Sequence, residues 1–383
     1  MKILIYAHAF APMVGGAETL VMTLAQGLVQ QLGNKNRKCV TVVTPTPQDG
    51  FDDEMLPFRV VRRPSLWQLV HLIRKVDIIH LAGPCFLPLL LGLLFCKPTV
   101  VEHHGFQTVC PNGQLLYEPA QVPCPGHFMA RRYYKCFRCN AKQGSLYSLK
   151  ICFLTFLRRW LCYLVSANIA LTNWLAAVLR LPRTTVIYCG VPDNTNDIDS
   201  QKFYTSLTFA FMGRLVSIKG VRILLDAVYR LKVEGLAFHL KIIGDGPERT
   251  ALEARTRVLG LNNHVTFMGY LPQQILEQVL SDVAVIVMPS LAGETFGLVA
   301  AENMMCGRLV VVSDIGVLSE VVGDGGLKFP PGDVDGLAKC LRKLLKNPEL
   351  VAQLSLEARR RALELFRRER MVEDHVSLYS QIL

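Results

Sequence analysis

The chain is 383 residues long; 51% of its residues are apolar and 19% are charged. This length predicts two domains, each with its own core, and the composition excludes a disordered or collagen-like protein. Twelve cysteines are too few for a disulfide scaffold. A short apolar run precedes a glycine loop at the N-terminus, with no cleavage site. We therefore interpret it as a first strand, and we expect a cytoplasmic protein with reduced cysteines.

Positive charge is concentrated in the first half of the chain. Residues 1–187 hold 20 Lys and Arg against 8 Asp and Glu. The net charge of the whole chain is +11. No acid lies between Pro119 and Pro192. This half is expected to attract nucleic acid, phospholipid or a phosphorylated substrate. Its apolar stretches are too short or too charged to span a bilayer, and segment 151–171 is more typical of a helix at a bilayer surface.

The first half alternates β-rich and helical segments. Strands are predicted at 2–8, 39–44, 58–62, 77–81, 98–103, 168–172 and 185–188. Helices are predicted at 17–31, 66–74, 87–95, 145–165 and 174–181. Continuous apolar strands that alternate with helices indicate a parallel sheet covered on both faces. Residues 105–144 interrupt the alternation, and we interpret them as a cysteine-rich insertion.

The second half repeats the alternation after a polar, turn-rich segment at 190–201, which is the predicted linker. Strands are predicted at 207–212, 239–243, 265–268, 283–288 and 308–313, and helices at 221–234, 247–259, 272–280, 297–305, 336–345 and 348–365. The fold class is therefore α/β, with doubly wound, Rossmann-like domains at 1–189 and 190–366. A C-terminal helix at about 367–383 is expected to pack back on the first domain. Such sheets bind ligands at the carboxyl ends of their strands, which predicts an interdomain cleft.

Two short motifs are typical of loops that bind phosphate. Gly15 and Gly16 join the first strand to the first helix, where paired glycines let backbone amides approach an anion. Arg214 and Lys219 follow a strand and precede a helix, where two cations can bind a diphosphate. A tight turn and two solvated cations are the alternative interpretations.

Segment 289–307 carries two carboxylates around a helix N-terminus. Glu294 precedes a helix predicted to begin near Phe296 or Gly297, and Glu302 lies about one and a half turns inside it. The first amides of a helix favour an anion, and carboxylates accept hydrogen bonds from sugar or ribose hydroxyls. Taken singly, Glu294 could be a helix-start charge and Glu302 a surface residue.

Together these motifs resemble the retaining glycosyltransferases of family 4, also called group 1, which have the GT-B fold. The resemblance covers nearly the whole chain. It rests on GGAE at 15–18, GRLVSIKG at 213–220, IIGDGPE at 242–248, VTFMGYLP at 265–272 and ETFGLVAAE at 294–302. The last of these has the family's spacing of two glutamates separated by seven residues.

The resemblance implies a role for each matching residue. Arg214 and Lys219 would hold the donor diphosphate and stabilise the charge on the leaving nucleotide. Glu302 would bind the ribose hydroxyls, and Glu294 the hydroxyls of the transferred sugar. The remaining donor site would comprise Gly16 near the phosphates, Met268, Gly269 and Tyr270 beside the base, and the amides of Phe296, Gly297 and Leu298.

His104 resembles the family's strand-end histidine beside the sugar, although the adjacent His103 is an alternative. The family also implies transfer with retention, without a divalent metal or other required cofactor, because the basic pair replaces the metal at the diphosphate. Two departures leave the subfamily open. Cys189 stands where the family usually has asparagine, and Arg308 where proline is common.

Four cysteines of the insertion could bind structural zinc. They are Cys110, Cys124, Cys136 and Cys139, of which the last two have the C-x2-C spacing of a zinc half-site. The first two are not spaced as in a zinc finger. Buried free thiols or a labile disulfide are therefore the alternatives to zinc.

We therefore predict a hexosyltransferase that is peripheral on the cytoplasmic face of a membrane. It would move a sugar from a nucleoside diphosphate sugar to a glycan or to a polyprenyl- or other lipid-linked acceptor. An anionic membrane surface is an expected partner, whereas nucleic acid is not. A catalytically inactive binding partner and a sugar-nucleotide epimerase of the same fold are the alternatives.

Overall fold

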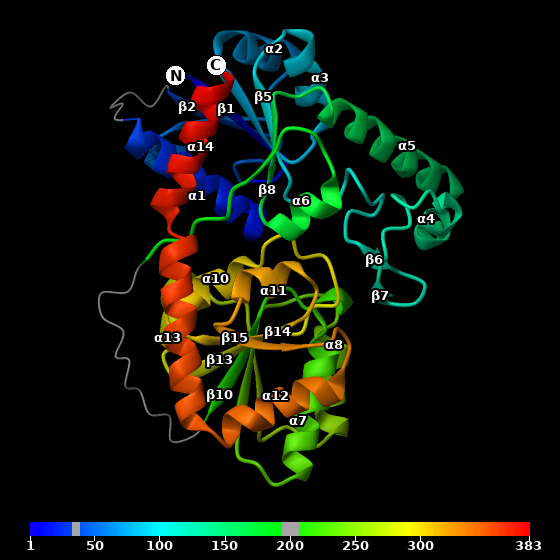
Figure 1. Cartoon of the computed structure of the whole chain (residues 1–383), viewed down its shortest axis with the longest axis vertical. Helices are drawn as coiled ribbons and strands as arrows, with labels where there is room; N and C mark the ends of the chain where they lie inside the picture. The colour runs from blue at the N-terminus through cyan, green and yellow to red at the C-terminus, as the bar shows by residue number, and fades with distance from the viewer. Residues whose placement is uncertain (33–38, 194–206) are drawn as a thin grey trace. The chain divides into compact units, whose positions relative to one another are not determined.

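Figure 1 shows a computed structural model of the chain, which describes residues 1–32, 39–193 and 207–383. The chain forms two compact units. The first unit comprises Met1–Leu115, Pro125–Val191 and Phe366–Leu383, and the second comprises Leu116–Cys124 and Pro192–Leu365. Residues 194–201 of the predicted linker lie outside the described residues. Within the described residues, no helix has the length and apolarity needed to cross a membrane.

The first unit contains a seven-stranded parallel sheet in the order β3-β2-β1-β4-β5-β8-β9. The strands are β1 (Ile3–Ala7), β2 (Val40–Thr44), β3 (Arg59–Arg62), β4 (Ile78–Ala82), β5 (Thr99–Glu102), β8 (Ala167–Ala170) and β9 (Thr184–Val186). Interior strands such as β5 and β8 are buried throughout, as expected of a sheet covered on both faces. The strand order reverses between β1 and β4, which is the arrangement of a doubly wound sheet.

Helices cover the first sheet, including one from the C-terminal end of the chain. They are α1 (Gly16–Gln31), α2 (Leu66–Lys75), α3 (Phe86–Leu94), α4 (Tyr133–Cys139), α5 (Ser145–Cys162), α6 (Asn173–Leu179) and α14 (Arg368–Ile382). Helix α14 packs on α1 at Gly27, where an added Cβ would lie 2.3 Å from Cγ2 of Val372. The absence of a side chain at Gly27 therefore allows these two helices to approach closely.

The predicted insertion at 105–144 does not form one body. It contains helix α4 and a two-stranded hairpin, β6 (Leu116–Tyr117) and β7 (Val122–Pro123). Helix α4 packs on α5, with Phe128, Cys136 and Cys152 in a small apolar cluster. The hairpin belongs to the second unit.

The second unit contains a six-stranded parallel sheet in the order β12-β11-β10-β13-β14-β15. The strands are β10 (Thr208–Met212), β11 (His239–Ile243), β12 (Val265–Gly269), β13 (Val283–Met288), β14 (Leu309–Ser313) and β15 (Gly326–Phe329). The helices are α7 (Val221–Val233), α8 (Arg249–Val258), α9 (Gln273–Val279), α10 (Leu298–Met305), α11 (Val317–Val322), α12 (Val334–Leu345) and α13 (Pro348–Leu365). This order reverses between β10 and β13. The predicted class of two Rossmann-like α/β domains is thereby confirmed.

Candidate active site

Four of the five sequence motifs meet at the carboxyl edge of the second sheet, where the strand order reverses. The loops after β10, β11 and β12 are joined by backbone hydrogen bonds from Gly213 to Ile243 (3.0 Å), Leu215 to Asp245 (2.9 Å) and Gly244 to Gly269 (2.8 Å). Because the strands are parallel, their carboxyl ends share this edge. The topology thus places these four motifs, which lie between residues 213 and 302, at one edge of the sheet as a candidate site.

The loops after β10 and β13 are held together by a glycine contact. Gly220 has a φ of +68°, and a Cβ there would lie 2.0 Å from the carbonyl oxygen of Pro289. The amide of Leu291 also donates to the carbonyl of Ile218 at 2.7 Å. Glycine is required at 220 both by its backbone conformation and by this close approach. The contact fixes the loop that carries Lys219 against the loop that carries Glu294.

Lys219 and Glu294 form an ion pair at this contact. Lys219 Nζ lies 2.5 Å from Glu294 Oε1, and the hydroxyl of Ser290 donates to the same oxygen at 2.9 Å. Arg214 follows β10 at the same edge and is exposed, and among the described residues its guanidinium has no ion-pair partner. The site therefore presents one cation that is already paired and one that is open to an anion.

Glu302 lies within α10 and is partly exposed. Burial raises the pKa of its carboxyl to about 7. No residue in the described part of the chain donates a hydrogen bond to this carboxylate. The cost of desolvating its charge is thus not repaid within the protein. A ligand hydroxyl that donates to Glu302 would relieve that cost.

The remaining predicted donor-site residues lie on the same edge. Helix α10 begins at Leu298, after Phe296, which is buried, and Gly297, which has a φ of +95°. The first amides of this helix have no partner within the helix and can bind an anion. Met268 and Gly269 end β12, and Tyr270 after them is 63% exposed.

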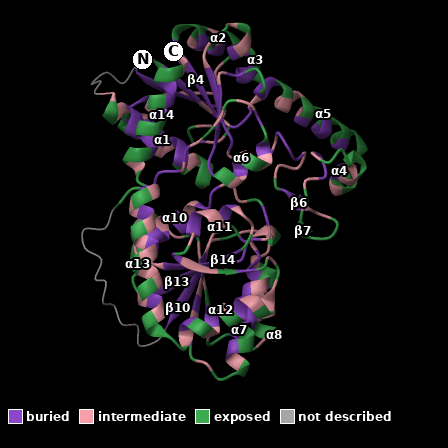
Figure 2. Cartoon of the chain, in the orientation of Figure 1, coloured by how far each residue is buried: buried purple, intermediate pink, exposed green. Residues whose placement is uncertain are grey.

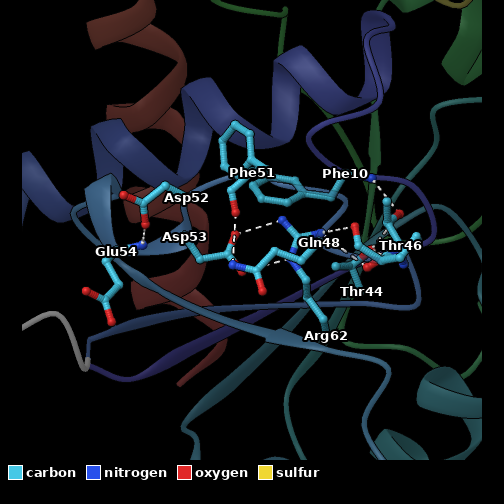
Figure 3. Close-up of polar contacts among 10 residues, drawn as sticks. Phe10, Thr44, Thr46, Gln48, Phe51, Asp52, Asp53, Glu54 and Arg62 are labelled. Carbon is cyan, nitrogen blue, oxygen red and sulfur yellow. Dashed lines mark hydrogen bonds and ion pairs between the residues drawn. The ribbon is translucent and has the colours of Figure 1, made fainter.

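Two predicted site residues, Gly16 and His104, belong to the first unit. Gly16 begins α1, and Glu18 already lies in the first turn of this helix. The preceding loop is anchored where the amide of Phe10 donates to Thr46 Oγ1 at 3.1 Å. Figure 3 shows this contact beside Arg62, which forms an ion pair with Asp53 at 2.7 Å. These contacts hold the turn before α1 at the carboxyl ends of β1 and β2.

The structure distinguishes the two adjacent histidines that follow β5. His103 is fully buried and its Nε2 lies 3.0 Å from Asn168 Oδ1; burial lowers its pKa to about 4. His104 is partly exposed, and its Nε2 lies 2.7 Å from Glu102 Oε2. His103 is therefore a core residue, and His104 is the histidine of the pair that remains a site candidate. Glu102, which ends the apolar strand β5, was not singled out by sequence reasoning.

The four insertion cysteines are not gathered into a metal-binding set. The Sγ of Cys110 donates to Asn112 Oδ1 at 2.9 Å, and Asn112 Nδ2 donates to the Sγ of Cys139 at 3.4 Å. Cys136 is buried beside α5, and Cys124 belongs to the second unit. Among the described residues, no cysteine takes part in a group of three ligand atoms within 4.8 Å of one another. Zinc binding here stays a prediction that metal analysis would test.

Comparisons with known proteins agree with this architecture. Residues 14–195 match the model of Glycosyltransferase Family 4, and residues 206–347 match that of Glycosyl transferases group 1. The structure of Anabaena Alr3699/HepE in complex with UDP superposes with a TM-score of 0.73 at 20% identity, over 100% of both chains. Two Rossmann-like α/β units, each with a parallel sheet, define the GT-B class of proteins to which this fold belongs. The chain belongs to family 4 of the glycosyltransferases.

Curated relatives match over shorter segments. The chain is 34% identical over 140 residues to the 2-deoxystreptamine glucosyltransferase of Streptomyces kanamyceticus, a segment that covers 36% of each protein. It is 34% identical over 174 residues to the MMP alpha-(1->4)-mannosyltransferase of Mycolicibacterium hassiacum, covering 44% of this chain and 41% of the relative. The chain thus spans roughly two fifths of the length of these relatives.

Proposed function

We propose that the protein is a glycosyltransferase that uses a nucleoside diphosphate sugar and retains the configuration of the transferred sugar. The observation that carries this proposal is the ion pair between Lys219 and Glu294 at the edge where the strand order of the second sheet reverses. Arg214 on the loop after β10 and Glu302 in α10 lie on elements of the same edge. Two cations suit a diphosphate, and two carboxylates suit hydroxyl groups. This is the combination that a sugar nucleotide presents.

Each of these side chains has a distinct part in the proposed reaction. Arg214 binds the diphosphate, and Lys219 exchanges part of its contact with Glu294 for a phosphate oxygen. Glu294 then accepts hydrogen bonds from the sugar, and Glu302 accepts them from the ribose. The bond between the sugar C1 and the phosphate oxygen breaks while the acceptor oxygen bonds to C1 on the same face. The acceptor proton passes to the departing phosphate, whose charge the two cations stabilise.

The test measures nucleotide binding and transfer in the same variants. Arg214→Ala and Lys219→Ala should each lower kcat by about 10²–10³-fold, as loss of a donor to developing charge commonly does. Arg257→Ala, at an exposed position near the end of α8, is the matched control and should leave kcat unchanged. Near-normal kcat in both site variants would contradict the assignment.

The donor and the reaction class are identified by ligand screening. UDP, GDP, ADP and their common sugars are ranked by thermal shift, because a ligand at 100 times its Kd adds about 2.7 kcal/mol of stability. Slow hydrolysis of the donor in the absence of acceptor is expected of a transferase. A protein that binds the donor without hydrolysing or transferring it would be the inactive binding partner, and one that converts the sugar at its own carbon atoms would be an epimerase.

A second feature of the chain supports a membrane-bound acceptor. Large apolar side chains recur at helical spacing on an exposed face of α5. Figure 2 shows that exposed positions occur along this helix. These residues are Leu146 (84% exposed), Leu149 (59%), Phe153 (64%), Phe156 (44%) and Trp160 (60%). Soluble monomers rarely expose such a continuous apolar row. We call this row the α5 stripe.

The charge around the α5 stripe favours an anionic lipid surface. The segment 119–192 contains bases but no acid, and Lys150 is exposed on α5 itself. Other aromatic residues of this region have a structural role instead: Phe128 is buried and packs against Phe156, with ring centroids 4.7 Å apart and ring planes tilted by 52°. Basic residues near an anionic bilayer each contribute about 1 kcal/mol, and exposed aromatics suit the headgroup boundary. We propose that this surface holds the protein on the cytoplasmic face of a membrane, where a lipid-linked acceptor would be available.

Vesicle sedimentation tests this second proposal. Wild-type protein should bind vesicles more strongly as their phosphatidylglycerol content rises and less strongly as salt rises. Phe153→Asp with Trp160→Asp should abolish binding, whereas Val258→Asp, at an 85% exposed position of the second unit, should not. Indifference to lipid charge would refute the proposal. Concentration-dependent dimerisation that only the α5 variants abolish would instead make the stripe an interface between copies of the chain.

A further inference from the structure

An arginine without a partner lies on the inner face of α5. Residues at helical spacing bury this face against the rest of the first unit, among them Thr155 and Cys162. Arg158 lies three residues after Thr155 and four before Cys162, so it belongs to the same face. Its Nε is buried, and no residue in the described part of the chain accepts a hydrogen bond from it. The residue as a whole is only partly buried, so a ligand in solution can reach the guanidinium.

The adjacent arginine shows what a structural role requires at this place. Arg159 donates to the carbonyl oxygens of Leu179 and Arg180 at 2.7 and 3.0 Å, and so ties α5 to the end of α6. Among the described residues Arg158 makes no such bond, and the segment from Pro119 to Pro192 contains no acid that could pair with it. Charged groups that leave water are usually paired. Arg158 therefore holds no part of the described fold together, and its charge is available to a ligand.

The charge of Arg158 acts where the strand order of the first sheet reverses, between β1 and β4. Tyr6 of β1 pairs in register with Leu81 of β4, and Cys85 follows β4 and precedes α3. Burial raises the pKa of the Cys85 thiol to about 11, and Arg158 is the charged residue that opposes this rise. Burial, and then the charge of this thiol, raises the pKa of Tyr6. Doubly wound sheets bind ligands outside the carboxyl ends of their strands at such a reversal.

An apolar row begins beside this arginine. Leu87, Leu90 and Leu94 follow one another at helical spacing along α3 and are 45%, 40% and 68% exposed. Leu87 is two residues after Cys85, and α3 packs on α5, the helix that carries Arg158 (Figure 1). We call these three leucines the α3 row; none of them belongs to the α5 stripe. A cation at the first turn of α3 and leucines along the rest of it match an anionic head group joined to an apolar chain.

We propose that Arg158 binds the phosphate of a lipid-linked acceptor and that the α3 row binds the first part of its apolar chain. This inference rests on the proposed function and names the class of acceptor, a phosphate ester of an apolar alcohol. A guanidinium can donate to two phosphate oxygens at once, which gives Arg158 the partner that the described residues do not provide. The leucines of the α3 row lose contact with water when the chain covers them.

Calorimetric titration of the full chain, without nucleotide, tests the binding of the phosphate. Geranyl phosphate should bind at least about tenfold more tightly than geraniol or inorganic phosphate. Arg158→Gln should weaken this binding by about 10–100-fold, as loss of a hydrogen bond to a charged group commonly does. Arg158→Lys should weaken it less, because the charge remains while the paired geometry is lost. Arg138→Gln removes the same charge from an exposed position of α4 and should leave the Kd unchanged.

The α3 row is tested by the same titration. Leu87→Ser with Leu94→Ser should reduce the affinity for geranyl phosphate to that for inorganic phosphate and leave the latter unchanged. Val233→Ser, at a 68% exposed position at the end of α7, is the control and should change neither affinity. Geranyl phosphate that binds no more tightly than inorganic phosphate would overturn the proposal. Equal effects of Arg158→Gln and Arg138→Gln, or a thermal midpoint that Arg158→Gln lowers, would overturn it as well.

Phospholipid head groups are the other source of phosphate that the experiment must distinguish. Vesicles that contain phosphatidylglycerol should bind Arg158→Gln and Arg138→Gln equally. Loss of vesicle binding in Arg158→Gln alone, with its binding of geranyl phosphate intact, would make Arg158 a bilayer contact and overturn the proposal. Hydrolysis of the donor without acceptor is measured separately. Donor hydrolysis without binding of geranyl phosphate would contradict this inference alone, whereas binding of geranyl phosphate by a protein that binds no nucleotide would contradict the proposed function.

Discussion

Replacing Glu302 by glutamine should stabilise the ligand-free protein, and it should do so only at neutral and alkaline pH. Burial raises the pKa of this carboxyl from 4.5 to about 7, so the folded protein binds the proton more tightly than the unfolded chain does. A carboxyl whose pKa is raised in the folded state contributes stability at low pH, and this stability is lost as the pH rises from 4.5 to about 7. A shift of about 2.5 pKa units at 1.36 kcal/mol each costs the wild type about 3 kcal/mol above pH 7.

The assay is urea denaturation of the wild type and Glu302→Gln at pH 5 and pH 8. The variant lacks the titrating charge, so its advantage in unfolding free energy should grow by about 2 kcal/mol between these two values. Glu373→Gln, at an exposed position of α14, is the matched control and should show no such growth. A difference that does not depend on pH, or a variant less stable than the wild type at pH 8, would refute the reasoning.

The same residue predicts how nucleotide binding depends on pH. Under the proposed function, ribose hydroxyls donate to the ionised form of Glu302, so the nucleotide lowers its pKa and releases a proton on binding. Affinity for the true donor nucleotide should therefore rise as pH increases through about 7. The Glu302→Gln variant should lose this pH dependence and bind the nucleotide more weakly. Glu302 would then lower the stability of the ligand-free protein but strengthen nucleotide binding.

Three further outcomes are expected. Gly220→Ala should lower the thermal midpoint of the second unit well beyond the effect of Gly235→Ala. Both glycines have a positive φ, but only a Cβ at 220 would meet the backbone, 2.0 Å from the carbonyl oxygen of Pro289. Equal effects of the two variants would contradict the close contact. Arg159→Ala should destabilise the protein by about 1–3 kcal/mol in urea, because this guanidinium donates to two backbone carbonyls at 2.7 and 3.0 Å; an unchanged midpoint would show that these bonds contribute little. If structural zinc is present, metal analysis of freshly reduced protein should find about one equivalent that Cys136→Ser with Cys139→Ser removes, and absence of zinc would favour buried thiols.

Local patterns predicted the regular part of the fold because each pattern lies within one element. The strands 239–243 and 283–288 and the helix 348–365 coincide with the structure. Helix α11 and strand β15 were missed, since elements of six and four residues are too short to show a period. The hairpin inside 105–144 was missed because its strands have two residues each.

The candidate site was predictable only where its residues lie in contiguous motifs. Arg214 and Lys219 stand in one loop, and Glu294 and Glu302 at one helix start, so spacing alone identified them. The buried contacts of Glu102 with His104 and His375 were not predictable in this way. The neighbouring contact joins Tyr379 to His80 across 299 residues, and no local pattern marks a contact of that range. A charged residue at the end of the apolar strand β5 was the available signal.

Helix α14 also determines when the first unit can finish folding during synthesis. Residues 366–383 leave the ribosome after the whole of 192–365, which at 5–20 residues per second takes roughly 10–35 s. Throughout that delay the nascent first sheet holds Glu102 without His375, whose Nε2 lies 3.4 Å from Glu102 Oε1 in the folded chain, and the face of α1 at Gly27 remains uncovered. The second unit can therefore reach its native packing before the first. Ribosome-bound chains released before α14 should be captured by chaperones through the first unit.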